Sequence, residues 1–218
     1  MVQTHLTSTF QDHAMRKIKL SQAIAAVLLA APLLASADSS NLITNGSFEA
    51  NTQNDGTYGI YSTLIGWTGN TDIELRNNIA GTAFDGVNYV ELDTTINSSM
   101  SQSFNTTFGQ TYQLSFAYSP RENVGSDSNG IEVFWNGGSL GTFSGTGSAS
   151  GNTWRVETLD VLGTGEWTTL RFDAVGTSDS LGGSLDNVSV TAVPEPQTYA
   201  LMLAGLGVMG FLVRRRKN

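Results

Sequence analysis

The most informative feature of this 218-residue sequence is what its central part lacks. Residues 38–193 contain no cysteine, no histidine and no lysine. The absence of cysteine excludes disulfide bonds, and the joint absence of histidine and cysteine excludes Ser-His-Asp and Cys-His nucleophile systems. Zinc, copper and haem sites of the usual kind are excluded for the same reason. Without lysine there is neither a Schiff base nor a P-loop.

Positive charge is also scarce in this part of the chain. Residues 38–193 contain ten Asp and seven Glu but only four Arg, which gives a net charge of −13. The value of −8 for the whole chain hides this imbalance, because seven of the eleven cationic residues lie in the terminal segments. Such a charge repels nucleic acid and anionic lipid, so neither is expected as a partner. Two chemistries remain open: binding of a hard cation and glycoside hydrolysis by a carboxylate pair.

The N-terminal segment has the organisation of a secretory signal peptide. A basic stretch at Arg16–Lys19 is followed by an apolar stretch at Ala23–Ala35 and by an Ala-Ser-Ala cleavage sequence. We interpret residues 1–37 as this signal peptide, with Met15 as the true start and residues 1–14 as a start-site misassignment. A permanent N-terminal anchor is the alternative, but the apolar stretch is short for a membrane span and a cleavage sequence follows it.

The C-terminal segment, residues 193–218, has three parts. The sequence Val-Pro-Glu-Pro comes first, and its two prolines favour an extended linker. An uncharged, mostly apolar run of 16 residues follows at Thr198–Val213, and four cations at Arg214–Lys217 end it. As a helix the run rises about 24 Å, slightly less than a hydrocarbon core of about 30 Å. We predict a C-terminal transmembrane helix with its cations in the cytoplasm; a buried amphipathic helix is disfavoured because the run has no polar face.

This order of parts resembles the PEP-CTERM sorting signal of Gram-negative bacteria. The motif residues are Pro194, Glu195 and Pro196. The resemblance implies export, transient anchoring in the inner membrane by the C-terminal helix, and processing at or near the motif by an exosortase. It also implies a final location at the cell surface or outside the cell, but it does not imply an activity.

The domain between these segments, residues 38–192, alternates apolar and polar residues as β-strands do. Every second residue from Tyr112 to Tyr118 is aromatic or aliphatic, and no helical period occurs in the domain. We expect nine or ten strands and an all-β fold, a two-sheet antiparallel sandwich of the jelly-roll type. The most clearly predicted strands are Asn88–Leu92, Ser99–Phe104, Thr111–Ser119, Ile131–Trp135, Ser139–Phe143, Thr168–Ala174 and Ser184–Thr191.

Short motifs spread along this domain resemble those of galactose-binding-like jelly rolls, a superfamily that includes several carbohydrate-binding modules. The motifs are Asn41–Glu49 (NLITNGSFE), Gly66-Trp67, Asp85-Gly86 with Tyr89–Leu92, Gly109–Phe116 and Leu185–Val188 (LDNV). Each motif is weak alone, but together they cover nearly all of residues 41–191 in the expected order. The resemblance is therefore more specific for the fold than for a ligand.

A structural cation is the first candidate site. Asp186 lies at the start of the last predicted strand, where an inward carboxylate is costly unless it is paired or bound to metal. In related carbohydrate-binding modules the Glu of the opening motif and the Asp of the closing motif share a calcium ion. By that resemblance Glu49 and Asp186 bind Ca²⁺, and Ser47 supplies a further oxygen. The alternative is that Asp186 caps backbone amides and Glu49 is solvated.

A sugar-binding surface is the second candidate, because the C–H faces of sugars stack on aromatic rings. Tyr58, Tyr61 and Trp135 are the aromatic residues selected for this role. Tyr58 and Tyr61 lie in the polar segment Asn51–Ser62, where a core position is least expected. For each aromatic residue, burial in the core is the competing interpretation.

Glycoside hydrolysis is the third possibility, and it needs two carboxylates across a cleft. Asp72 with Glu74, or Glu91 with Asp93, share a strand face by their spacing, but a solvated acidic face is the favoured interpretation, because a small sandwich without a long cleft rarely hosts this chemistry. We therefore predict a non-enzymatic, exported surface or matrix protein that binds extracellular polysaccharide. A purely structural matrix protein without a sugar ligand is the alternative.

Overall fold

The computed structural model of the protein describes residues 40–194 and 196–216. The predicted signal peptide, residues 1–37, and Glu195 of the sorting motif lie outside the described residues. The β-rich body up to Pro194 and the C-terminal helix belong to separate units, and each is described by itself.

Residues 40–194 form ten β-strands and no α-helix. The strands are β1 (Thr57–Leu64), β2 (Trp67–Asn77), β3 (Asn88–Glu91), β4 (Ser99–Thr106), β5 (Thr111–Ser119), β6 (Gly130–Trp135), β7 (Gly138–Phe143), β8 (Arg155–Leu162), β9 (Glu166–Val175) and β10 (Ser184–Ala192). All the pairings between these strands are antiparallel, as the sequence predicts.

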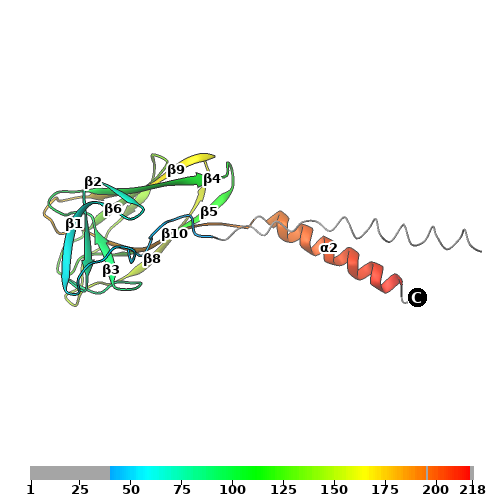
Figure 1. Ribbon diagram of the computed structural model, residues 1–218, viewed down its shortest axis with the longest axis horizontal. Helices are drawn as coiled ribbons and strands as arrows, with labels where there is room; N and C mark the ends of the chain where they lie inside the picture. The colour runs from blue at the N-terminus through cyan, green and yellow to red at the C-terminus, as the bar shows by residue number, and fades with distance from the viewer. Residues whose placement is uncertain (1–39, 195, 217–218) are drawn as a thin grey trace, which may run out of the picture. The chain divides into compact units, whose positions relative to one another are not determined.

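The strands form one continuous sheet that curls over on itself, so the prediction of two separate sheets is wrong. The strand order is β7-β6-β9-β4-β2-β3-β10-β5-β8, with β1 beside β2. Strand β2 joins the two layers, because its residues 68–70 pair with β4 and its residues 74–77 pair with β3. Between these two stretches Thr71 has a φ of 69°, which bends the strand. Figure 1 shows β2, β4 and β9 along one side of the body and β3, β8 and β10 along the other.

The space between the layers is filled by the residues that alternate inward along each strand. All four expected residues of β5, from Tyr112 to Tyr118, are buried in this core. Aromatic rings bridge the layers: Phe172 of β9 contacts Phe116 of β5 edge to face and Trp67 of β2 in a tilted arrangement. The core thus follows the sequence alternation, and burial of these rings is the main source of stability in a body without disulfides.

Three strands are absent from the clearly predicted set: β2, which lies within the sheet, and β1 and β8, which lie at its margins. Strand β1 overlaps the polar segment Asn51–Ser62, and β8 pairs only with β5. Six of the eight residues of β1 are exposed, and five of those of β8. A strand with so little burial needs no apolar alternation, which explains why the pattern did not reveal it.

The C-terminal unit contains a helix, α2 (Pro196–Arg215), which begins at the second proline of the sorting motif. A proline at the first position of a helix is favourable because its φ is already helical and no N–H is lost there. The prediction of a helix is therefore confirmed. In the described part of the chain, however, none of the helices has the length and apolar character needed to cross a membrane, so the predicted transmembrane span is not found.

Candidate functional site

The first residues of the body are hydrogen-bonded to the last strand. The Val188 N–H donates to the Gly46 carbonyl (2.9 Å), and the Leu42 N–H donates to the Val190 carbonyl (2.9 Å). Gly46 is required here, because a Cβ atom at this position would collide with the Val188 carbonyl. These contacts hold the opening motif and the closing motif together.

Glu49 binds the backbone of the loop formed by residues 84–88. Its Oε1 atom accepts hydrogen bonds from the N–H groups of Val87 (2.8 Å) and Asn88 (2.7 Å). The carboxylate lies against Gly86, where any side chain would meet it. Glu49 itself is exposed, which agrees with the alternative interpretation of a solvated carboxylate.

Asp186 binds the other end of the same loop and is fully buried. Its Oδ2 atom accepts hydrogen bonds from the N–H groups of Phe84 (2.8 Å) and Asp85 (2.9 Å), and its Oδ1 atom accepts one from Asn187 (2.6 Å). Burial raises the pKa of Asp186 to about 7, although these three N–H groups oppose the shift.

A β-bulge explains why Asp186 does not point into the core. Pairing between β10 and β5 shifts register after Asp186, and Asn187 has a φ of 46°. Leu185 before the bulge and Val188 after it both face the core, so Asp186 lies on the opposite face. The expectation that the Asp186 carboxylate points inward from the last strand is therefore wrong.

The predicted calcium ligands do not fit a calcium site in this arrangement. Asp186 directs both of its oxygens, and Glu49 one of its own, at backbone N–H groups, while Ser47 lies half-buried in the preceding turn. Within the described ranges, no cluster of three or more Asp, Glu, His or Cys side chains is placed to hold a metal ion. Calcium prefers six to eight oxygen ligands, so binding here would require the carboxylates to leave their N–H donors. Calcium binding stays a prediction that this geometry does not favour.

A second buried acidic group, Glu91, lies in an ionic cluster on the outer face of β2 and β3. Glu91 forms ion pairs with Arg121 (2.7 Å) and Arg76 (3.1 Å), and Arg76 also pairs with Glu74 (2.7 Å). Glu74 and Glu91 are directly opposite each other on the two strands, and Arg76 lies between their charges. Burial raises the pKa of Glu91 to about 7, and the two arginines oppose the shift.

The pairs proposed for glycoside hydrolysis are engaged in such structural contacts. Asp93 is fully buried and accepts hydrogen bonds from the N–H groups of Asp179 (2.9 Å) and Ser180 (3.0 Å). Glu91 and Glu74 are held by arginines, as described above. Asp72 is half-buried in β2, just after the bend of that strand. Glu74, Glu91 and Asp93 therefore serve to hold strands and loops together.

The three aromatic residues predicted to bind sugar are not brought together. Trp135 is in the core, 8% exposed, and its indole N–H donates to the Leu162 carbonyl (2.8 Å). Its selection as a ligand-binding residue is therefore wrong, because strand alternation places it inward on β6. Tyr58 and Tyr61 remain exposed, but three residues apart on β1 they point to opposite faces.

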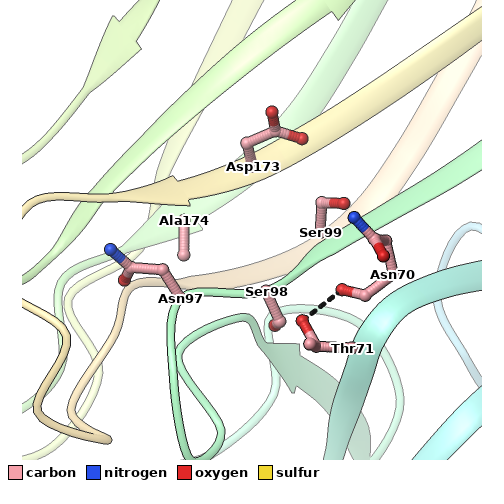
Figure 2. Close-up of a pocket in the computed structure, with 7 residues that line it drawn as sticks. All are labelled: Asn70, Thr71, Asn97, Ser98, Ser99, Asp173 and Ala174. Carbon is pink, nitrogen blue, oxygen red and sulfur yellow. Dashed lines mark hydrogen bonds between the residues drawn. The ribbon is translucent and has the colours of Figure 1, made fainter.

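A polar pocket of about 160 Å³ lies beside the bend of β2 (Figure 2). Its walls come from β2, from β9, and from the start of β4 with the turn before it. The lining residues are Asn70, Thr71, Asn97, Ser98, Ser99, Asp173 and Ala174. Figure 2 shows amide, hydroxyl and carboxylate groups gathered around this space. The pocket thus offers both donors and acceptors of hydrogen bonds in a small volume.

Two side chains of the pocket are held in place by contacts outside it. The Asn97 Nδ2 atom donates to the Gly176 carbonyl (3.0 Å), while its Oδ1 atom is buried without a hydrogen-bond partner among the residues described here. Asp173 forms an ion pair with Arg171 (2.8 Å), whose guanidinium stacks on Phe134 at 4.3 Å from the ring centre. Burial raises the pKa of Asp173, and Arg171 opposes this shift.

Nothing in the sequence indicated this pocket. Its residues come from three segments, 70–71, 97–99 and 173–174, that are separated by 26 and 74 positions, and Ser, Thr and Asn in such segments usually indicate loops. Only the pairing of β4 with both β2 and β9 brings them together. The unpartnered Asn97 oxygen is a feature of the folded state alone, so no sequence signal could have identified it.

Comparison with known families confirms the assignment of the C-terminal segment. Residues 192–217 match the PEP-CTERM protein-sorting motif. This motif implies export, processing by an exosortase and sorting to the cell surface. The chain therefore carries the sorting signal that the sequence order predicted, although the match covers only this segment.

Comparison of the body with other proteins supports its fold. A multifunctional-autoprocessing repeats-in-toxin protein of Vibrio vulnificus is 32% identical over 166 residues, which is 74% of this chain but only 3% of that protein. A Stig cyclase from Fischerella sp. TAU superimposes with a TM-score of 0.54 at 18% identity, covering 71% of this chain and 98% of the cyclase. An arabinose-bound α-L-arabinofuranosidase gives a TM-score of 0.50 at 12% identity, covering 73% of this chain and 27% of that enzyme. At such identities the structural matches define a shared jelly-roll-like fold and nothing further.

Proposed function

We propose that this protein is exported to the cell surface or the extracellular matrix, where its β-sandwich binds a neutral polysaccharide. The sorting motif supports the destination, and the pocket of Figure 2 supports the binding role. The observation that carries the proposal is a small pocket lined almost entirely by amide, hydroxyl and carboxylate groups.

The chemistry of the pocket suits sugar hydroxyl groups. Each hydroxyl both donates and accepts a hydrogen bond, and the pocket contains side chains of both kinds. The unpartnered Asn97 oxygen needs a donor, because a buried acceptor left without one costs about 1–3 kcal/mol. Asp173 offers a second acceptor, and a hydroxyl bound between charged and amide groups makes hydrogen bonds of above-average strength.

The charge of the body restricts the class of glycan. With a net charge of −13 for residues 38–193 and a carboxylate in the pocket, an acidic polysaccharide would be repelled. A neutral chain of hydroxyl-bearing sugars carries no such cost. We therefore expect binding to neutral glycans that changes little with salt concentration.

Binding without catalysis is part of this proposal. The buried carboxylates are held by arginines or backbone N–H groups, and the pocket contains a single carboxylate, Asp173. Glycoside hydrolysis of the usual kind needs two carboxylates flanking the bond. The protein therefore retains a polysaccharide rather than cleaving it.

Affinity electrophoresis in native gels that contain a soluble polysaccharide tests the proposal. We expect retardation by at least one neutral glycan, such as dextran, galactan or xylan, and none by alginate. Asn97→Ala should weaken retardation about tenfold, the equivalent of 1.4 kcal/mol. The control is Asn105→Ala, an exposed residue of β4 that does not line the pocket. If no neutral glycan retards the protein, it is a purely structural matrix protein; release of reducing sugar would contradict the non-catalytic role.

A further inference from the structure

Asparagine followed directly by glycine occurs at three places in the sequence: Asn45-Gly46, Asn129-Gly130 and Asn136-Gly137. Such a pair is chemically labile, because the backbone nitrogen of the glycine can attack the side-chain Cγ atom of the asparagine, and glycine has no side chain to obstruct the attack. The reaction requires a carboxamide group that is free to rotate and a glycine N–H group that is not hydrogen-bonded. The fold treats the three pairs differently in these respects.

The Asn45 side chain is held at both ends of its carboxamide group. Its Nδ2 atom donates to Asn51 Oδ1 (3.0 Å) and to the Ile65 carbonyl (2.9 Å), and its Oδ1 atom accepts a hydrogen bond from the Ala50 N–H (2.9 Å). Rotation of the carboxamide toward Gly46 would break these three hydrogen bonds. The fold therefore protects this pair from the reaction.

The Asn129 side chain is fully buried and has even more hydrogen bonds. Its Nδ2 atom donates to three backbone carbonyls, and its Oδ1 atom accepts a hydrogen bond from the Arg121 N–H (2.9 Å). The glycine that follows is the first residue of β6 and pairs with β9. Both partners of the reaction are thus fixed, and water is excluded from them.

Asn136 and Gly137 form the two-residue turn between β6 and β7, and both are exposed. Their φ angles of 49° and 85° are those of the left-handed hairpin turn that Asn-Gly favours. Among the residues that the structure describes, neither the Asn136 carboxamide nor the Gly137 N–H has a hydrogen-bond partner. The space beside Gly137 is also open. Only the conformation of the turn itself therefore opposes the attack.

We propose that Asn136 is a site of spontaneous deamidation, with the Gly137 nitrogen as the nucleophile. This nitrogen loses its proton and bonds to Asn136 Cγ, while the bond from Cγ to Nδ2 breaks and ammonia leaves with the proton. Water then opens the resulting succinimide ring. Hydrolysis at the side-chain carbonyl gives aspartate, and hydrolysis at the backbone carbonyl gives isoaspartate, in which the main chain runs through Cγ.

Formation of isoaspartate would weaken the β6–β7 hairpin. It adds a carbon atom to the main chain within a turn whose flanking residues, Trp135 and Gly138, are paired with each other. It also displaces the Asn136 N–H, which donates to the Thr169 carbonyl (2.8 Å). In the described body β7 pairs with β6 alone, so this edge of the sheet depends on the turn. The modification therefore acts as a slow and irreversible loosening of one sheet edge.

Peptide mapping by mass spectrometry tests the proposal on the full chain after incubation at mildly alkaline pH. Fragmentation of the peptides assigns the mass increase from amide to acid to one particular asparagine. We expect conversion at Asn136 to be at least about tenfold faster than at Asn45 or Asn129, because those two must first break their hydrogen bonds. In guanidinium chloride, which removes the fold, the three rates should agree within about threefold.

The variant Asn136→Gly tests the structural consequence, because it removes the reacting carboxamide and suits the left-handed turn. After the same incubation, amide hydrogen exchange in β7 should become faster in the wild type and stay unchanged in this variant. Equal acceleration in both proteins would contradict the proposed effect on the hairpin.

Three results would overturn the assignment of the site. The first is an Asn136 that stays unmodified in the folded protein while the unfolded chain reacts. The second is an equal rate at Asn136 and Asn129 in the folded protein. The third is a difference between them that persists in guanidinium chloride, which would assign the reactivity to neighbouring sequence rather than to the fold. Glycan retention in native gels does not depend on this turn, so the two proposals fail independently.

Discussion

Glu91 and Asp186 are two fully buried carboxylates, and the cost of burying them is offset in different ways. Each has its pKa raised to about 7 by burial. Glu91 is held by the side chains of Arg76 and Arg121, whereas Asp186 is held by three backbone N–H groups. The first arrangement joins a strand to distant loops through charge. The second fixes the path of one loop through backbone hydrogen bonds.

The difference determines which substitutions each site tolerates. In the ionic cluster, loss of an arginine leaves an uncompensated buried charge, which is among the largest costs that one substitution can impose. At Asp186, loss of the carboxylate leaves neutral N–H groups without acceptors, at a lower cost for each group. Four experiments test this difference, beginning with the substitution expected to be most destabilising.

Arg76→Leu should give the largest effect, because Arg76 pairs with both Glu74 and Glu91. We expect a loss of about 3–5 kcal/mol in the free energy of unfolding, measured by urea denaturation. Arg155→Met is the control, since the Arg155–Glu157 pair is partly exposed and should contribute about 1 kcal/mol or less. Equal effects of the two substitutions would show that the buried cluster has no special role.

Asp186→Ala should cost about 2–3 kcal/mol, because it leaves the N–H groups of Phe84, Asp85 and Asn187 without their acceptor. Amide hydrogen exchange should become faster in the loop of residues 84–88 and remain unchanged in β5. Unchanged exchange in that loop would mean that Glu49 alone fixes it.

The free energy of unfolding should fall as the pH rises from 6 to 8. The folded-state pKa values of Glu91 and Asp186, about 7, lie above their ordinary values of 4.5 and 3.8. The folded protein therefore holds protons that the unfolded chain has released, and this stabilisation is lost as the pH passes 7. Each group should contribute about 1.4 kcal/mol over this range, so Asp186→Asn should remove about half of the dependence. A pH dependence unaltered in Asp186→Asn would show that Asp186 is ionised when folded.

Calcium should have the smallest effect. Because Glu49 and Asp186 bind backbone N–H groups, we expect millimolar calcium, or its removal by EDTA, to move the melting temperature by less than about 2 °C. A larger stabilisation that Asp186→Asn abolishes would restore the calcium site inferred from the family resemblance, with the ion displacing these N–H donors.

Much of the fold follows from local sequence pattern. Alternation along Thr111–Ser119 predicted β5 to the residue, from one short stretch of chain. The family resemblance joined Glu49 and Asp186 through a calcium ion, which stays a prediction, and in the structure both residues bind backbone N–H groups of one loop. No local signal joins these two positions, which are 137 residues apart.

What the pattern missed depends on contacts between distant segments or on a single backbone angle. Arg121 lies 30 residues from Glu91, and no spacing rule joins them. The bulge at Asn187 reverses the face of Asp186, and the positive φ of Thr71 joins the two layers into one sheet. Trp135 alternates correctly into the core, so its misassignment came from reading aromatic residues as ligands before burial was known.

The polar pocket lies beside the bend at Thr71, where strand β2 passes from one layer to the other. This position has a thermodynamic consequence. The bend exists only when β2 is paired with both β4 and β3, so the pocket cannot persist when one of these pairings is lost. A ligand bound in the pocket would therefore stabilise the body as one cooperative unit. Ligand binding should therefore raise the melting temperature of the single unfolding transition rather than stiffen one loop locally.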